Sequence, residues 1–237
     1  SVTDVLEKVR KDTLLVSVMH VNNETGITQP VYEIGEALQD KDVLFHVDAT
    51  QSFGKLVEEL QQIKYNMLSM SAHKLGGPQG IGALILRKQR YKLPPVKPIM
   101  YGGQQEHGIR PGTLPVALIA GLGKACEIAE KEYKTNIQQC RNIKNKINTM
   151  LEESGLEYKY NGLQEALMLS SKDFCSISNG SACNSKSYSP SYVLLAMGIP
   201  KDQIESSVRI SWGHDITIDE IEKSFQNVIE AAKGLVW

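Results

Sequence analysis

The sequence has 237 residues, of which 41% are hydrophobic, and a formal net charge of −1. This length supports a sizeable core and one or two domains, whereas the near-neutral charge favours neither nucleic acid nor an anionic membrane as a partner. No apolar run approaches the roughly 18 residues that span a bilayer, and no charged-then-apolar signal peptide opens the chain. The four cysteines form no CxxC pair and have no histidine at zinc-site spacing, so we expect a cytoplasmic protein with reduced thiols and no metal site.

Strands and helices alternate in the patterns of the first 90 residues. Thr3 is a suitable cap for a short helix, and the apolar run LLVSVMHV indicates a strand buried on both faces. Pro30 suits the first position of the next helix. The strands are expected at 14–21, 43–48, 67–70 and 81–86, and the helices at 3–10, 30–39 and 51–64. This order predicts an α/β fold with a parallel sheet and right-handed crossovers.

One long helix and several shorter elements are predicted in the second half. An apolar stripe at steps of three and four residues predicts a helix over 115–153, and Cys126 and Cys140 lie on this stripe, which assigns both to packing. The shorter elements are strands at 174–178 and 207–212, a helix from Ser189-Pro190 to Ala196, and a last helix with a capping box of Thr217 and Glu220. We expect a large domain over 1–132 and a small one over 133–237.

Two residues at predicted strand ends carry the candidate chemistry. Lys74 follows one buried strand and Asp48 ends another, and ligands of open α/β sheets bind at the carboxyl ends of strands. A lysine beside a buried carboxylate is the combination that pyridoxal 5'-phosphate (PLP) needs. Alone, Lys74 is more simply a solvated turn lysine. The glycines of GGPQGIG, at 76–82, predict a close approach of backbone to backbone and no nucleotide, since the pattern is not GxGxxG.

Four segments together carry a resemblance to a known family. HVDATQ at 46–51, SAHK at 71–74, GGQQEHGIRPGT at 102–113 and NGSAC at 179–183 resemble the motifs of the NifS/IscS cysteine desulfurases. The resemblance is collinear from near the N-terminus to about Asp219. It implies the type I fold of PLP-dependent transferases (aminotransferase class V), with a mostly parallel sheet in a large domain and a smaller α/β C-terminal domain.

The resemblance assigns a cofactor-binding role to seven residues. It implies that Lys74 is catalytic and binds the PLP aldehyde and that Asp48 holds the pyridine nitrogen. The other five residues would bind the ring oxygen or the phosphate. The ring-oxygen ligands are Asn23 and Gln51, and the phosphate ligands are Ser71, His73 and Thr113. The family's matching threonine reaches the PLP of the neighbouring subunit, which implies a homodimer. Taken alone, Thr113 is equally a residue near a helix N-cap. His107 stands where the family usually has arginine.

The resemblance also implies how substrate and sulfur are handled. Arg209, with Asn23, would bind the carboxylate of L-cysteine, although a surface arginine and a turn asparagine are the simpler interpretations. Cys183 lies in a small, polar segment at 179–189, where the family carries the thiol that takes sulfur. Cys175 is assigned to structure. The implied reaction converts L-cysteine to L-alanine and leaves a persulfide on Cys183 for sulfur-acceptor or scaffold proteins, in iron–sulfur cluster assembly or another pathway.

Two alternatives remain open at this point. One is another class V PLP enzyme, an aminotransferase or selenocysteine lyase, against which the thiol of Cys183 argues because transamination needs none. The other is a truncated, inactive homologue that only binds partners. The family has a preceding segment with a phosphate-binding threonine and a ring-stacking histidine, and a further stretch between positions like Gly162 and Leu163. Because the sequence opens at Ser1, without Met, we expect it to begin inside a larger protein.

Overall fold

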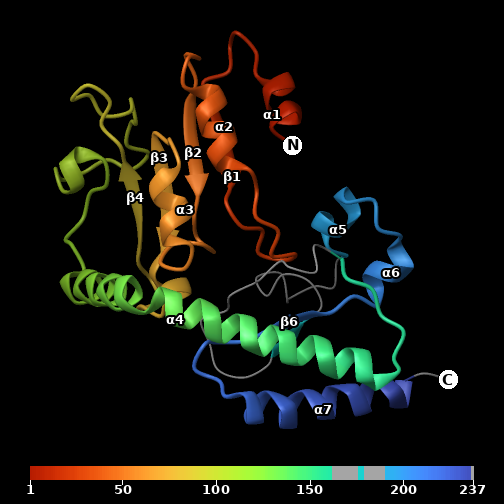
Figure 1. The fold of residues 1–237 in the computed structure, drawn as a ribbon. Helices are drawn as coiled ribbons and strands as arrows, with labels where there is room; N and C mark the ends of the chain where they lie inside the picture. The colour runs from red at the N-terminus through yellow and green to blue at the C-terminus, as the bar shows by residue number, and fades with distance from the viewer. Residues whose placement is uncertain (162–175, 179–189, 236–237) are drawn as a thin grey trace. The chain divides into compact units, whose positions relative to one another are not determined.

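The computed structural model describes residues 1–161, 176–178 and 190–235 (Figure 1). The helices are α1 (Val2–Lys8), α2 (Val31–Leu38), α3 (Val57–Gln62), α4 (Val116–Ser154), α5 (Tyr192–Ala196), α6 (Lys201–Glu205) and α7 (Ile218–Leu235), with 3-10 turns η1 (Ala72–Leu75) and η2 (Glu106–Gly108). The strands are β1 (Leu15–Met19), β2 (Leu44–Asp48), β3 (Met67–Ser71), β4 (Gly82–Leu86), β5 (Ser176–Ser178) and β6 (Arg209–Ser211). Within this described part, no helix combines the length and apolar character needed to cross a membrane.

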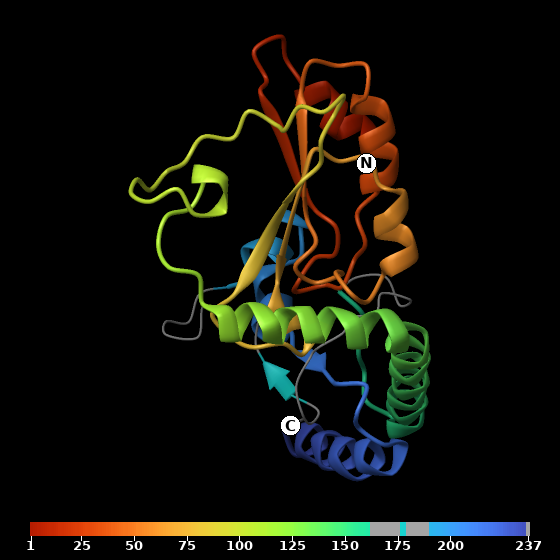
Figure 2. The same ribbon diagram turned by 90° about the vertical axis from the view of Figure 1, so that its left-hand side faces the viewer.

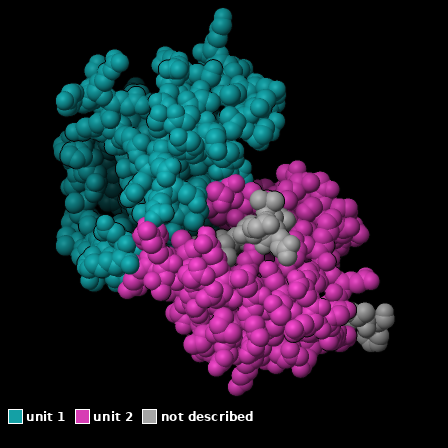
Figure 3. Space-filling view, viewed as in Figure 1, with its two compact units in different colours: residues 1–20, 29–131 teal, residues 21–28, 132–237 magenta. Residues whose placement is uncertain are grey.

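The chain divides into two compact units, which Figure 3 colours separately. Unit 1 comprises residues 1–20 and 29–131, and unit 2 comprises residues 21–28 and 132–237. Eight residues near the N-terminus therefore belong to the unit formed by the C-terminal half. Helix α4 contributes residues to both units. Each unit is described by itself below.

Unit 1 is built on a four-stranded sheet in the order β1-β2-β3-β4. Both β1–β2 and β2–β3 are parallel, and α2 and α3 form the crossovers between them. Strand β4 runs antiparallel to β3, because the connection from Ser71 to Gly82 is shorter than the dozen or more residues that a parallel crossover needs. The mostly parallel α/β sheet predicted from the sequence is confirmed.

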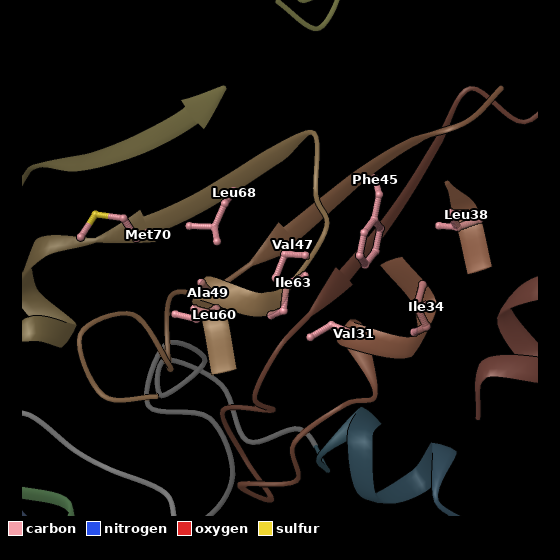
Figure 4. Packing of buried hydrophobic residues seen from close by; sticks show 10 residues of the cluster. All are labelled: Val31, Ile34, Leu38, Phe45, Val47, Ala49, Leu60, Ile63, Leu68 and Met70. Atoms are coloured by element: carbon pink, nitrogen blue, oxygen red, sulfur yellow. The ribbon is translucent and has the colours of Figure 1, made fainter. Parts of the chain in front are cut away.

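Period-two alternation places the core of unit 1 on one face of this sheet. Phe45 and Val47 of β2 and Leu68 and Met70 of β3 are buried at 8% exposure or less. Figure 4 shows them together with the apolar side chains of α2 and of the segment around α3, namely Val31, Ile34, Leu38, Ala49, Leu60 and Ile63. The sheet therefore buries one face against its two crossover helices.

The burial of β1 and the start of α1 differ from expectation. Leu15 is 46% exposed and exposure alternates along β1, so the prediction of a strand buried on both faces is wrong. Helix α1 is capped by Ser1, whose hydroxyl accepts from the Asp4 N–H, and not by Thr3, which lies inside the helix. Both serine and threonine suit this position by type, and only the backbone path decides which one caps.

Unit 2 has its own core between α4 and α7. Cys140, Ile143 and Ile147 of α4 pack with Trp212 and with Ile221, Phe225 and Ile229 of α7. The predicted capping box of α7 is present, since the Thr217 N–H donates to Glu220 Oε2 at 2.9 Å and the Glu220 N–H donates to Thr217 Oγ1 at 3.3 Å. The packing role expected for Cys140 is confirmed.

The bounds and caps of the short elements of unit 2 differ from those predicted from the sequence. Strand β6 pairs antiparallel with β5, with Arg209 opposite Ser178. Helix α5 is capped by Ser191, two residues beyond the predicted Ser189, which lies outside the described residues. Helix α6 starts after Pro200 and was not expected from its five residues.

Candidate active site

Asp48 and Lys74 lie at, or directly after, the ends of two neighbouring parallel strands. Asp48 is the last residue of β2, Ser71 is the last residue of β3, and η1 with His73 and Lys74 begins immediately after Ser71. In the β2–β3 register Asp48 lies opposite Ser69. Because parallel neighbours end at the same edge of a sheet, unit 1 presents the carboxylate and the amine at one edge.

The turn after β2 is fixed by hydrogen bonds around Asp48. The Asp48 carboxylate accepts from the Thr50 N–H at 2.9 Å. The Ala49 N–H donates to the Ser69 carbonyl at 2.9 Å, and the Ala49 carbonyl accepts from the Phe53 N–H at 2.7 Å. Gln51 is half-buried within this turn. The arrangement holds Asp48 and Gln51 near the end of β2.

The turn after β3 brings a hydroxyl, an imidazole and the lysine together. Ser71 Oγ and His73 Nδ1 lie 2.7 Å apart and share a hydrogen bond. Gly76 ends η1 with a φ of +81°, and Lys74 is half-buried two residues before it. The predicted close backbone approach occurs at Gly82, where an added Cβ would lie 2.5 Å from the Met70 carbonyl oxygen.

A row of polar side chains crosses three strands on the face opposite the core. His46 Nδ1 lies 2.8 Å from Ser17 Oγ of β1, and its Nε2 lies 3.1 Å from Ser69 Oγ of β3. Burial lowers the pKa of His46, and the Asp48 charge opposes this shift. A neutral imidazole in this row donates from one ring nitrogen and accepts at the other. Sequence reasoning missed the row, since it depends on the strand register.

Thr113 lies on an exposed loop that precedes α4. Its neighbour Gly112 donates its N–H to the Gln105 side-chain oxygen at 3.1 Å. His107, in the same loop, adopts a left-handed φ of +57°. The loop and Thr113 belong to unit 1 with Asp48 and Lys74.

Asn23 and Arg209 come together in unit 2, although 186 residues separate them. Arg209 Nη1 donates to the Asn23 carbonyl at 3.1 Å. Among the described residues, the buried Arg209 Nε has no hydrogen-bond partner. Arg209 also lines a cavity of about 790 Å³, together with Glu24, Thr25 and Trp212. A buried guanidinium N–H without an acceptor suits an anionic oxygen as its ligand.

The turn that carries Asn23 has a second contact, which sequence reasoning missed. The Ser191 hydroxyl donates to Glu24 Oε2 at 2.5 Å. The polar composition of NNETG at 22–26 was the available signal, but its partner lies 167 residues away. Cys183 and Cys175 lie outside the described residues.

The chain is similar to one protein family, to curated proteins and to solved structures. The profile of the family described as Aminotransferase class-V matches residues 1–161. Cysteine desulfurase IscS of Histophilus somni (strain 2336) is 41% identical over 244 residues, covering 96% of this chain and 59% of that protein. A solved NifS-like protein is similar with a TM-score of 0.82 and 29% identity, over 99% of this chain and 65% of that one. The structure described as SspA in complex with cysteine has a TM-score of 0.61 and 33% identity, over 90% and 62% of the two chains. The chain thus spans about 59% of the length of this curated relative.

Proposed function

The chain belongs to the class-V aminotransferase family, and from this premise we propose that it acts as a PLP-dependent cysteine desulfurase. The observation that carries the proposal is the placement of Asp48 as the last residue of β2 and of Lys74 directly after the adjacent parallel strand β3. The relative from H. somni is named a cysteine desulfurase, and SspA was solved with cysteine. Because the chain spans about 59% of that relative, the substrate and reaction are part of the proposal.

The residues of unit 1 fit the groups of PLP. The Lys74 amine is the nucleophile for the cofactor aldehyde, and Asp48 is the acceptor for the protonated pyridine nitrogen. The Ser71–His73 pair, 2.7 Å apart, supplies a hydroxyl and an imidazole as phosphate ligands. Bound PLP supplies an electron sink for the substrate α-carbon. Gln51, held in the turn after Asp48, would donate to the ring oxygen, and Asn23 is the second residue that we propose as a ligand of that oxygen.

Arg209 is the residue that we propose for the substrate carboxylate. Its Nε is buried without a partner among the described residues, while Nη1 is already occupied by the Asn23 carbonyl. A carboxylate oxygen would satisfy the remaining buried N–H. The Lys74 amine is the group that would move the proton at the substrate α-carbon.

Cys183 is the proposed sulfur acceptor. Its thiolate attacks the substrate sulfur, the carbon–sulfur bond of L-cysteine breaks, and the new sulfur–sulfur bond leaves a persulfide on Cys183. The proton of the thiol goes to the carbon product, so L-cysteine and the thiol become L-alanine and the persulfide. The proposal includes a homodimer in which Thr113 reaches the phosphate of the partner subunit's PLP, and transfer of the sulfur to acceptor or scaffold proteins.

The test begins with the cofactor. PLP is added to the purified chain, the visible absorption is followed, and borohydride reduction with peptide mass mapping locates the bond. We expect a visible band and an adduct on Lys74, both lost in Lys74→Ala. A Cys183→Ala variant should keep the band and lose sulfide release from L-cysteine. Desulfuration at the parental rate by Cys183→Ala would refute the sulfur relay, and an adduct on another lysine would refute the site.

A further inference from the structure

The turn at 22–26 is a rigid, locally satisfied structure. Asn22 Oδ1 accepts from the Glu24 N–H at 2.9 Å, the Thr25 N–H at 3.0 Å and the Thr25 hydroxyl at 3.2 Å. The Gly26 N–H donates to the Asn22 carbonyl at 3.0 Å. Such an Asx turn fixes the peptide planes of consecutive residues relative to one another. A change in the position of Glu24 would therefore also move the Asn23 carbonyl.

Two consecutive residues of this turn bind two different segments of unit 2. The Asn23 carbonyl accepts from Arg209 of β6 at 3.1 Å, and the Glu24 carboxylate accepts from the Ser191 hydroxyl at 2.5 Å. Ser191 also accepts from the Leu194 N–H at 3.1 Å as the cap of α5. Its hydroxyl is thus held at both its donor and its acceptor side, which makes it a fixed anchor for Glu24.

We infer that Glu24 is a positioning residue for Arg209. By accepting from Ser191, Glu24 holds the turn so that the Asn23 carbonyl orients the guanidinium and leaves Nε aimed at an incoming carboxylate. The inference deepens the proposed function and rests on it for the identity of that carboxylate. The orientation itself is a property of unit 2 and depends on neither PLP nor activity.

The contact predicts a specific set of variants. Glu24→Ala and Ser191→Ala each remove the hydrogen bond, whereas Glu24→Gln keeps an amide oxygen that can accept from Ser191. The double variant Glu24→Ala/Ser191→Ala should equal the stronger single variant, because both single changes break the same bond. Glu157→Ala is the matched control, since Glu157 lines the same cavity and is not part of the contact.

The first readout is the reactivity of Arg209 in the chain without added cofactor. Phenylglyoxal modifies guanidinium groups, and peptide mass mapping gives the rate at Arg209. We expect a rise of about threefold or more in Glu24→Ala and Ser191→Ala, and the parental rate in Glu24→Gln and Glu157→Ala. Circular dichroism at the assay temperature establishes that each variant is folded. A parental rate in Glu24→Ala, or an equal rise in Glu24→Gln, would overturn the inference.

The second readout uses the chain with PLP and L-cysteine. A positioning role predicts a KM for L-cysteine raised severalfold in Glu24→Ala with kcat near the parental value, and recovery in Glu24→Gln. An unchanged KM beside a changed Arg209 reactivity would refute a carboxylate as the ligand and leave the positioning intact. If the parental chain releases no sulfide, the proposed function fails, while the phenylglyoxal comparison still decides the role of Glu24.

Discussion

At the scale of single residues, His20 makes the free energy of unfolding depend on pH. Its side chain is 2% exposed and lies 2.9 Å from Ser52 Oγ and 3.4 Å from Glu59 Oε2. Burial lowers the pKa of His20 to about 4. The unfolded chain therefore takes up the proton first, so stability present above the ordinary pKa of about 6.5 is lost as the pH falls towards 4. We expect a loss of about 2 kcal/mol between pH 7 and pH 5 from this group.

Urea unfolding at the two pH values measures this loss. His20→Asn, which keeps an amide near the Nδ1 position, should flatten the pH dependence by about that amount. The exposed His214 supplies the matched control, His214→Asn, which should keep the parental dependence. A parental slope in His20→Asn would contradict the assignment of the loss to His20.

At the scale of elements, the close approach of β4 to β3 is the sharpest constraint on the sheet. An added Cβ at Gly82 would lie 2.5 Å from the Met70 carbonyl oxygen, whereas one at Gly123 in α4 would meet nothing within 4 Å. Gly82→Ala must shift a backbone and should lower the free energy of unfolding by about 1–3 kcal/mol. Gly123→Ala should raise it by up to about 1 kcal/mol. Equal effects of the two substitutions in thermal unfolding would refute the contact.

Most elements were predictable because each has a local pattern. The apolar runs of β2 and β3, the stripe of α4 and the capping box of α7 involve neighbours in sequence. The five-residue α6 and the caps at Ser1 and Ser191 were not predictable, since several nearby residues suit each role. In the candidate site, sequence pattern located Asp48 and Lys74 at strand ends. The Ser191–Glu24 contact could not be foreseen, because tertiary structure alone brings together residues 167 positions apart. The expected domain boundary at 132/133 stays a prediction.

At the scale of the whole molecule, the two units have separate cores. Leu68 belongs to the cluster of unit 1 and Phe225 to that of unit 2, and both are 1% exposed. Leu68→Ala and Phe225→Ala should each cost about 2–5 kcal/mol in their own core. Hydrogen exchange followed by mass spectrometry should show faster exchange in β2 and β3 for Leu68→Ala, and in α7 for Phe225→Ala. Faster exchange throughout the described chain in both variants would instead indicate one cooperative unit.

The assignment of residues 21–28 to unit 2 has a consequence for how the molecule can be divided. The peptide chain passes between the units at 20/21, at 28/29 and again at 131/132. A protease that cuts α4 between residues 131 and 132 would therefore not release an intact unit 2, because residues 21–28, which hold Arg209, would remain on the N-terminal fragment with unit 1. For the same reason a gene fusion or recombination event with one breakpoint cannot exchange either unit as a module. Any such exchange must carry the eight-residue turn with its distant partner.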